Sequence, residues 1–136
     1  MGTSLRNPRG LISLKSGIVH ATPEGSLVRL STSADYTALL PGGASPTTPL
    51  FGLLYQATHP TLDNQPVEVV TDGVFPGIAG ASITAGDLLT SNGTDGTVKP
   101  VAAGAGTNEA VIGEAMEAAS SGERVAIFLM QHIRQG

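Results

Sequence analysis

Cysteine and tryptophan are both absent from this sequence, which therefore lacks several kinds of reactive or bulky side chain. Without cysteine there is no disulfide framework, no thiol nucleophile and no cysteine-based zinc site. No window of eighteen consecutive apolar residues occurs, so we expect no membrane-spanning helix. The N-terminal region has no long apolar stretch behind its early basic residues, which argues against a secretory signal.

Aromatic residues make up only 4% of the 136 residues. The length fits one domain, and we divide it into an extended N-terminal arm, residues 1–10, and a single β domain, residues 11–136. A core with so few large side chains gains support from burial against a partner, so we expect an oligomer. Eighteen Gly and nine Pro interrupt the chain too often for long helices.

The net charge of −4 is unevenly distributed. Residues 1–30 carry four basic side chains and one acidic side chain, whereas residues 31–123 carry one basic and ten acidic side chains. Because an acidic body repels phosphate groups, direct binding of nucleic acid is disfavoured. We therefore expect protein partners, and neither nucleic acid nor membrane.

Two segments have the composition of contact regions. The first ten residues contain Pro8 and Gly10 and have no apolar period, which fits either an extended arm or a frayed terminus. Residues 41–49 contain three Pro and two Gly, which cannot pair in a ladder, so they form either a contact loop between subunits or a solvated connector. Guanidinium groups suit carboxylates on a neighbouring subunit. The candidate contact residues are Arg6, Arg9, Lys15, Pro46 and Pro49.

Apolar patterning in the first half of the chain predicts strands. Residues 27–31 are rich in Leu and Val, and the continuous apolar run at 50–57 is typical of a strand buried on both faces. Residues 67–71 alternate as a half-exposed strand does, with Val67 and Val69 on one side and Glu68 on the other. Residues 35–40 fit either a strand or one helical turn.

Turn-forming residues separate further strands. Asp72-Gly73 predicts a turn, and Pro76 just after it implies a sheet edge or a bulge. Residues 81–101 predict a β-hairpin, because apolar pairs lie between turn formers and Asn92-Gly93 is a strong signal for a short hairpin loop. The apolar stretches at 110–118 and 124–129 extend this hairpin into a β-meander.

The meander carries a resemblance to a known family. It contains Ile-Thr-Ala-Gly-Asp-Leu-Leu at residues 83–89, Val-Lys-Pro-Val at 98–101 and Ala-Val-Ile-Gly-Glu-Ala-Met-Glu-Ala-Ala-Ser-Ser-Gly-Glu-Arg-Val-Ala-Ile-Phe-Leu at 110–129. Over residues 73–130 the chain resembles the small capsid cement, or head decoration, proteins of tailed bacteriophages. These motifs are moderately specific, because a turn, Gly-Asp and an apolar strand also occur in other small β-barrels.

The resemblance implies an all-β fold, a small β-barrel or β-sandwich, without enzymatic activity. It also implies an oligomer, usually a homotrimer, on the outside of the virion capsid, where it binds the major capsid protein and braces neighbouring capsomers. No cofactor is implied.

Chemistry-bearing patterns are weak throughout the sequence. His20, His59 and His132 lie far apart, and none has a second ligand type at metal spacing. There is no nucleophile elbow and no phosphate-binding loop. Asp87 fits an Asx-turn better than a calcium site. We therefore predict no catalytic residue, no cofactor-binding residue and no metal ligand.

Two other functions remain open from the residues alone. A tail or baseplate protein shares a β-rich, Gly-rich composition without cysteine. A small β-barrel processing enzyme shares the Gly-Asp-Leu-Leu turn, although the chain has neither cysteine nor a recognisable Ser/His/Asp arrangement.

Overall fold

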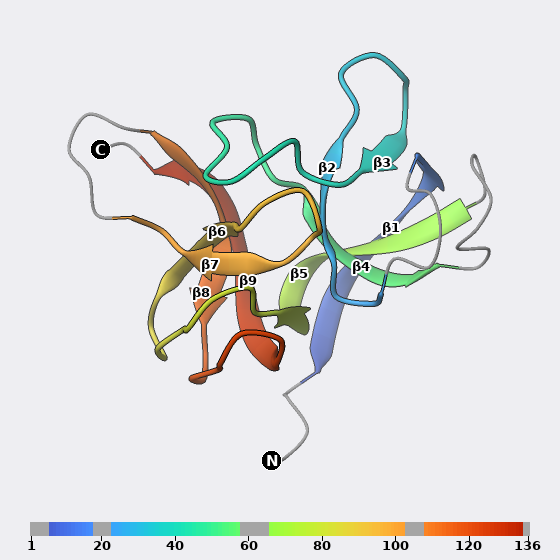
Figure 1. The fold of residues 1–136 in the computed structure, drawn as a ribbon. Helices are drawn as coiled ribbons and strands as arrows, with labels where there is room; N and C mark the ends of the chain where they lie inside the picture. Colours follow the sequence, from blue (N-terminus) through green and yellow to red (C-terminus); the bar gives the residue numbers. More distant parts are fainter. Residues whose placement is uncertain (1–5, 18–22, 58–65, 103–107, 135–136) are drawn as a thin grey trace.

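The computed structural model describes residues 6–17, 23–57, 66–102 and 108–134, and the structural statements below concern these residues. Within them the chain is all β, as the sequence predicts, and none of them forms a helix long and apolar enough to cross a membrane (Figure 1). The strands are β1 (Asn7–Ser16), β2 (Leu27–Leu30), β3 (Thr37–Leu39), β4 (Gly52–Ala57), β5 (Pro66–Ile78), β6 (Leu88–Ser91), β7 (Val98–Pro100), β8 (Glu109–Ala115) and β9 (Arg124–Arg134).

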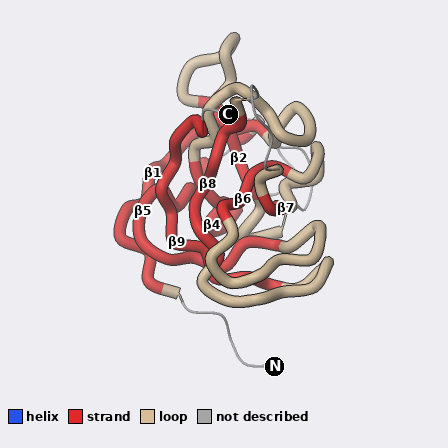
Figure 2. Tube along the Cα trace, turned by 90° about the vertical axis from the view of Figure 1, so that its left-hand side faces the viewer, coloured by secondary structure: helices blue, strands red, loops and turns tan. Residues whose placement is uncertain are grey.

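These strands form one mixed sheet in the order β1-β3-β2-β4-β5-β9-β8-β6-β7. β1 also pairs with β5, so the pairings from β1 through β3, β2, β4 and β5 return to the strand where they began. Among the pairings of these strands only β1–β3 is parallel. Figure 1 shows β1 to β4 on one side of the molecule and β6 to β9 on the other, and Figure 2 gives the view at right angles.

The longest strand, β5, joins the two halves. It pairs with β1 from Pro66 to Val74, with β4 from Val67 to Val70 and with β9 from Val74 to Ile78. The predicted turn at Asp72-Gly73 is wrong, because the strand continues through both residues. Gly73 has a φ of 90°, and the β1–β5 ladder shifts register beside it. The conformational freedom of this glycine therefore serves a β-bulge and not a turn.

Two hydrophobic clusters fill the interior. The larger one packs β5, β8 and β9 against neighbouring strands, with Phe75 as its largest fully buried side chain. The smaller one lies within the circuit of β1 to β5. Its buried members are Leu14, Val28, Ala38, Leu54, Val67 and Val69, with Leu40 and Phe51 packed against them.

Several strand predictions for the first half are confirmed. Val67 and Val69 are buried while Glu68 is exposed, as the alternation predicts. In β4, Leu53 and Leu54 are both buried, although they point to opposite faces. The ambiguous segment at residues 35–40 contains the strand β3, not a helical turn.

The predicted hairpin at residues 81–101 is confirmed as β6 and β7, which pair antiparallel. Its loop is longer than the Asn92-Gly93 signal predicts. The Asn92 N–H donates to the Thr97 carbonyl at 2.9 Å, and Gly96, with a φ of 84°, is the residue of this loop that adopts a positive φ. Hydrogen bonds from Thr97 to Asp95 stabilise this wider loop in place of a two-residue turn.

The C-terminal half departs from a simple meander at one point. β8 pairs with β9 on one side and with β6 on the other, so β7 lies at the outer edge of the sheet.

The boundary that we drew after residue 10, between an N-terminal arm and the β domain, falls within β1, because Asn7 already pairs with Val74. Asn7 to Gly10 are thus part of the sheet, and residues 1–5 lie outside the described residues.

Candidate docking surface

A groove of about 510 Å³ opens between β1 and the loop that joins β2 to β3. We call it the docking groove. A smaller depression of about 260 Å³ continues from it past Pro49, and a third depression of about 450 Å³ continues further to Pro46. The docking groove is lined by Ile12, Leu14, Leu30, Ser31, Thr32, Ser33, Ala34, Asp35, Tyr36 and Phe51.

Apolar side chains are exposed along this groove. Ile12 and Leu30 are each 41% exposed, and Tyr36 is 75% exposed. The floor includes Leu14 and Phe51, which belong to the smaller hydrophobic cluster. The groove is therefore continuous with the core, and a partner that filled it would extend the core outward.

Hydrogen bonds within residues 31–37 hold the loop above the groove in place. The Ser31 hydroxyl accepts the N–H groups of Ser33 at 3.2 Å and Ala34 at 3.1 Å. The Ser31 N–H donates to the Thr37 carbonyl at 2.8 Å, and the Thr37 hydroxyl donates to the Asp35 carbonyl at 3.0 Å. An ordered loop loses less conformational entropy when it binds, so it can present Tyr36 at low cost.

Tyr36 adopts an unusual backbone conformation. Its φ is 53°, a left-handed value that a bulky residue rarely takes. Its carbonyl accepts the N–H of Lys15 at 2.7 Å, which ties the loop to the end of β1. Residues in such conformations occur disproportionately at ligand clamps and binding loops.

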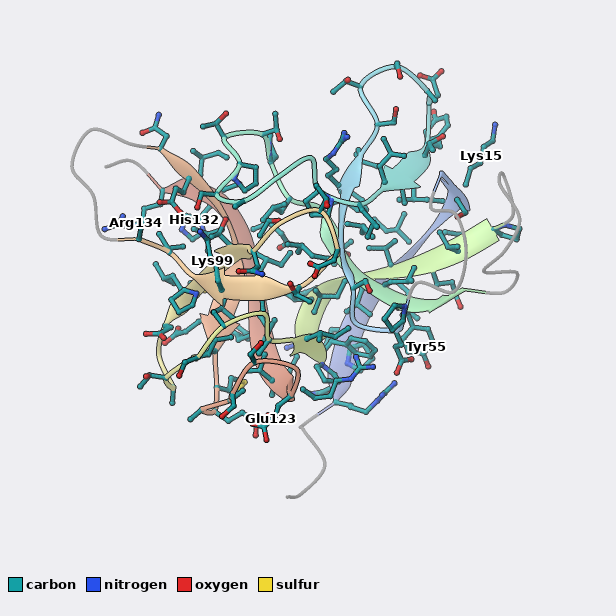
Figure 3. All side chains as sticks on the ribbon, viewed as in Figure 1. Lys15, Tyr55, Lys99, Glu123, His132 and Arg134 are labelled. Carbon is teal, nitrogen blue, oxygen red and sulfur yellow. The ribbon has the colours of Figure 1, made fainter. Side chains whose placement is uncertain are left out.

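The structure separates the five candidate contact residues into two groups. Lys15 lies near the end of β1, where its N–H bonds to Tyr36, and Pro49 and Pro46 lie in the depressions that extend the docking groove. Arg6 and Arg9 lie at or near the opposite end of β1. Figure 3 labels Lys15 on the far side of the molecule from His132 and Arg134. Three of the five candidates therefore lie around one surface.

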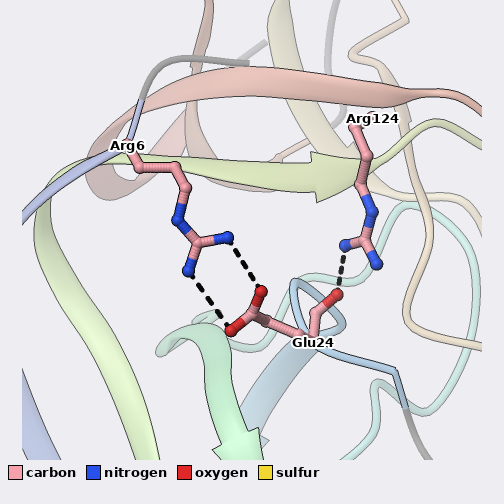
Figure 4. Close-up of polar contacts among 3 residues, drawn as sticks. All are labelled: Arg6, Glu24 and Arg124. Atoms are coloured by element: carbon pink, nitrogen blue, oxygen red, sulfur yellow. Dashed lines mark hydrogen bonds and ion pairs between the residues drawn. The ribbon is translucent and has the colours of Figure 1, made fainter. Parts of the chain in front are cut away.

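Arg6 already has a partner within the chain (Figure 4). Its Nη1 and Nη2 atoms donate to the two carboxylate oxygens of Glu24 at 2.9 and 3.3 Å, and its guanidinium lies 4.7 Å from the ring centre of Phe75. The hydrogen bond to Glu24 raises the pKa of Arg6 above its usual value. Arg124 donates to the backbone carbonyl of Glu24. A contact of Arg6 with a neighbouring subunit would thus compete with this ion pair.

The acidic residues and the histidine that could in principle act in catalysis or metal binding make local hydrogen bonds. Asp87 accepts the N–H of Thr84 at 2.9 Å, so its carboxylate does satisfy a backbone N–H, but the donor lies three residues before it and not two residues after it as in the predicted Asx-turn. Two hydrogen bonds from Thr97 lower the pKa of Asp95. Glu117 accepts the N–H of Ala126, and a ring nitrogen of the exposed His132 lies 2.7 Å from the Met130 carbonyl. His20 and His59 lie outside the described residues, which contain no group of three potential metal ligands.

Sequence reasoning missed the apolar residues of the docking groove. Ile12 and Leu30 follow ordinary strand patterns, and no periodic signal shows that their outer sides stay uncovered. A weak signal exists for Tyr36, because five small or turn-forming residues, 31–35, precede this large aromatic side chain.

Exposed apolar surface of this kind marks either a protein–protein contact or a ligand-binding groove. Residues 19–130 match the family model described as phage cement protein. The chain therefore belongs to the phage cement protein family and is a structural protein of a phage capsid. No curated protein matches the sequence.

A solved structure supports the fold assignment. The N base of head fiber gp8.5 of bacteriophage phi29 is similar, with a TM-score of 0.60 and 22% sequence identity. The alignment covers 89% of this chain and 93% of that chain. At this level of identity the likeness establishes the shared fold.

Proposed function

We propose that this protein binds the outer surface of a phage head, contacts the major capsid protein and braces neighbouring capsomers. The observation that carries the proposal is the docking groove, whose exposed apolar side chains lie beside an ordered loop in a chain of the phage cement protein family. Burial of Ile12, Leu30 and Tyr36 against the shell supplies a favourable free energy of binding.

The mechanism is mechanical. A bound copy that spans two capsomers adds contacts that must break before the capsomers separate. Binding to the assembled shell and not to free capsomers also shifts the equilibrium toward the shell by mass action. Such a protein acts through the area that it covers, so the proposal includes no catalysis and no cofactor.

An oligomer, most simply a homotrimer, is part of the proposal. The interior has few large side chains, and Phe75 is the one aromatic residue in the described chain that is fully buried. Burial of more apolar surface between copies compensates for such a core. Light scattering during size-exclusion chromatography tests this, with an expected mass of about three times 13.7 kDa. A monomer at micromolar concentration contradicts it.

The binding assay uses heads assembled without the protein, to which purified protein is added. We expect saturable binding, and heads that resist heat better once bound. Leu30→Ser, in the docking groove, should weaken binding by about fivefold or more, because loss of a buried apolar contact costs about 1 kcal/mol or more and about 1.4 kcal/mol corresponds to a tenfold change.

Met116→Ser is the matched control, because Met116 is 49% exposed but lies outside the groove. It should bind as the wild type does. Equal binding by both variants contradicts the assignment of the groove as the contact surface. Binding to isolated tails in place of heads contradicts the proposed function itself.

A further inference from the structure

β1 has an open edge beside the docking groove. One side of β1 pairs with β5 from Asn7 to Lys15. On the other side, β1 pairs with β3 through Lys15 and Ser16 alone, so no described strand pairs with Asn7 to Leu14 there (Figure 1). A strand edge with unpaired backbone groups is a template for another strand.

The direction of the backbone groups follows from the hydrogen bonds at the end of β1. The N–H groups of Lys15 and Gly17 donate to the carbonyls of Tyr36 and Ala38, so they point away from β5. Backbone groups in a strand alternate in direction with a period of two residues. The N–H and C=O groups of Leu11 and Ser13 therefore point toward the open side as well.

The middle of this edge is apolar on both faces. Leu11 is 46% exposed and Ile12 is 41% exposed. They pair with Val70 and Val69 of β5, which belong to the larger and the smaller hydrophobic cluster respectively. Soluble proteins commonly protect an open edge with charges or proline in its middle. Here an added strand would cover an exposed apolar side chain on each face.

The ends of the edge are basic. Arg9 and Lys15 are exposed, and β1 contains no acidic residue. Two copies of β1 paired with each other around a two-fold axis would gather four basic side chains along one ribbon, and like charges across a strand pair are destabilising. The charge of this edge is complementary to an acidic strand.

We propose that the open edge of β1 accepts an extended segment of the shell protein as an additional strand. This segment carries apolar side chains over Leu11 and Ile12 and acidic side chains near Arg9 and Lys15. Backbone hydrogen bonds to Leu11 and Ser13 hold it, and the docking groove receives its inward side chains. The inference rests on the proposed binding to phage heads.

Ser13→Pro tests the edge. Proline removes the outward N–H of residue 13, keeps the bonds of the ladder to β5, and is tolerated on the solvent side of an edge strand. We expect Ser13→Pro to weaken binding to heads by at least about tenfold, because it removes a hydrogen bond and obstructs strand addition. The matched control, Ser13→Ala, keeps the N–H and should bind within about twofold of the wild type.

Hydrogen exchange of the unaltered protein gives a second measurement that does not depend on the fold of a variant. The amides of Leu11 and Ser13 should exchange readily in the free protein and become protected when it binds heads. Binding of the wild type without protection of these amides overturns the strand addition, as does full binding by a folded Ser13→Pro variant. Protection that rises with the concentration of free protein shows a second copy on the edge and overturns the choice of occupant.

Charge reversal tests the acidity of the segment. The double variant Arg9→Glu, Lys15→Glu should bind heads at least about tenfold more weakly, and the wild type should lose affinity as salt rises. Lys99→Glu, Arg134→Glu makes the same change in net charge away from this edge and should have a smaller effect. Equal losses of binding in both double variants overturn the inference that the bound segment is acidic. Failure of the wild type to bind heads at all contradicts the proposed function and is thereby distinguishable.

Discussion

The N–H of Lys15 donates to the carbonyl of Tyr36 at 2.7 Å, and this bond joins the end of β1 to the loop that overhangs the docking groove. It brings the backbones of Lys15 and Tyr36 together, although 20 residues of sequence separate them. The edge of β1 opens immediately before this bond. Both proposals therefore concern the surface around this backbone contact.

Because Tyr36 has a left-handed backbone conformation, we expect its replacement to affect head binding and protein stability in different directions. Asn adopts a positive φ more readily than Tyr, so Tyr36→Asn should leave the free energy of unfolding unchanged or raise it by up to about 1 kcal/mol. The same variant should bind heads more weakly, because it removes an exposed ring. Tyr36→Phe, which keeps the ring, should bind normally. Thermal denaturation and head binding measure the two effects, and a clear loss of stability in Tyr36→Asn contradicts the strain assignment.

Gly73 predicts a large effect from a small substitution. An added Cβ would lie 2.3 Å from the Asn7 carbonyl oxygen, and the φ of 90° is also unfavourable for alanine. Gly73→Ala should lower the free energy of unfolding by about 2–4 kcal/mol. Gly86 has a φ of 93° with no atom near the position of its Cβ, so Gly86→Ala should cost only about 1–2 kcal/mol. Urea denaturation compares the two, and equal losses contradict a steric contribution at the bulge.

Arg6 and Glu24 should show a modest, salt-dependent coupling. A double-mutant cycle with Arg6→Ala and Glu24→Gln should give a coupling energy of about 0.3–1 kcal/mol, because exposed ion pairs are weak. Arg6→Ala alone should cost more than Glu24→Gln, since it also removes the guanidinium from the ring of Phe75. Urea denaturation at low and high salt measures both effects. A coupling that high salt leaves intact contradicts the ion-pair assignment.

The local sequence predicts which side chains of a strand are buried, but it does not predict which strands pair with each other. The alternation at Val67, Glu68 and Val69 predicts both a strand and its buried face, because side-chain burial depends on a period of two. Asp72-Gly73 suits a turn and a β-bulge equally well, because both need a residue that tolerates a positive φ. The bulge forms because β1 and β9 continue the ladders on either side of it, and such pairing is not a local property.

The docking groove escaped sequence analysis for a related reason. The motifs that indicate the family lie at residues 73–130, whereas the groove lies in the N-terminal half, between β1 and the loop after β2. Ile12 is exposed because β3 is only three residues long and pairs with the very end of β1. The exposure of Ile12 therefore depends on the length of another strand, and the sequence around Ile12 does not indicate it. Lys15 is a candidate contact residue from its charge alone.

Asp95 predicts how the β6–β7 loop responds to acid. The hydroxyl and N–H of Thr97 donate to its carboxylate at 2.7 and 3.1 Å and lower its pKa below the usual value. A carboxyl group whose pKa is lower in the folded state stabilises the fold above its unfolded pKa, about 3.9, and loses that contribution as the pH falls through the folded value. Between pH 5 and pH 8 the contribution should therefore be constant.

The matched variants for this test are Asp95→Ala and Asp95→Asn. At neutral pH, Asp95→Ala should lower the free energy of unfolding by about 0.5–1.5 kcal/mol, because it removes both acceptor bonds. Asp95→Asn keeps a neutral acceptor, so its deficit relative to the wild type should shrink as the pH falls below about 4. Denaturant unfolding at several pH values gives these differences. A deficit of Asp95→Asn that stays the same from pH 7 to pH 2.5 would show that the carboxylate charge contributes nothing to the loop.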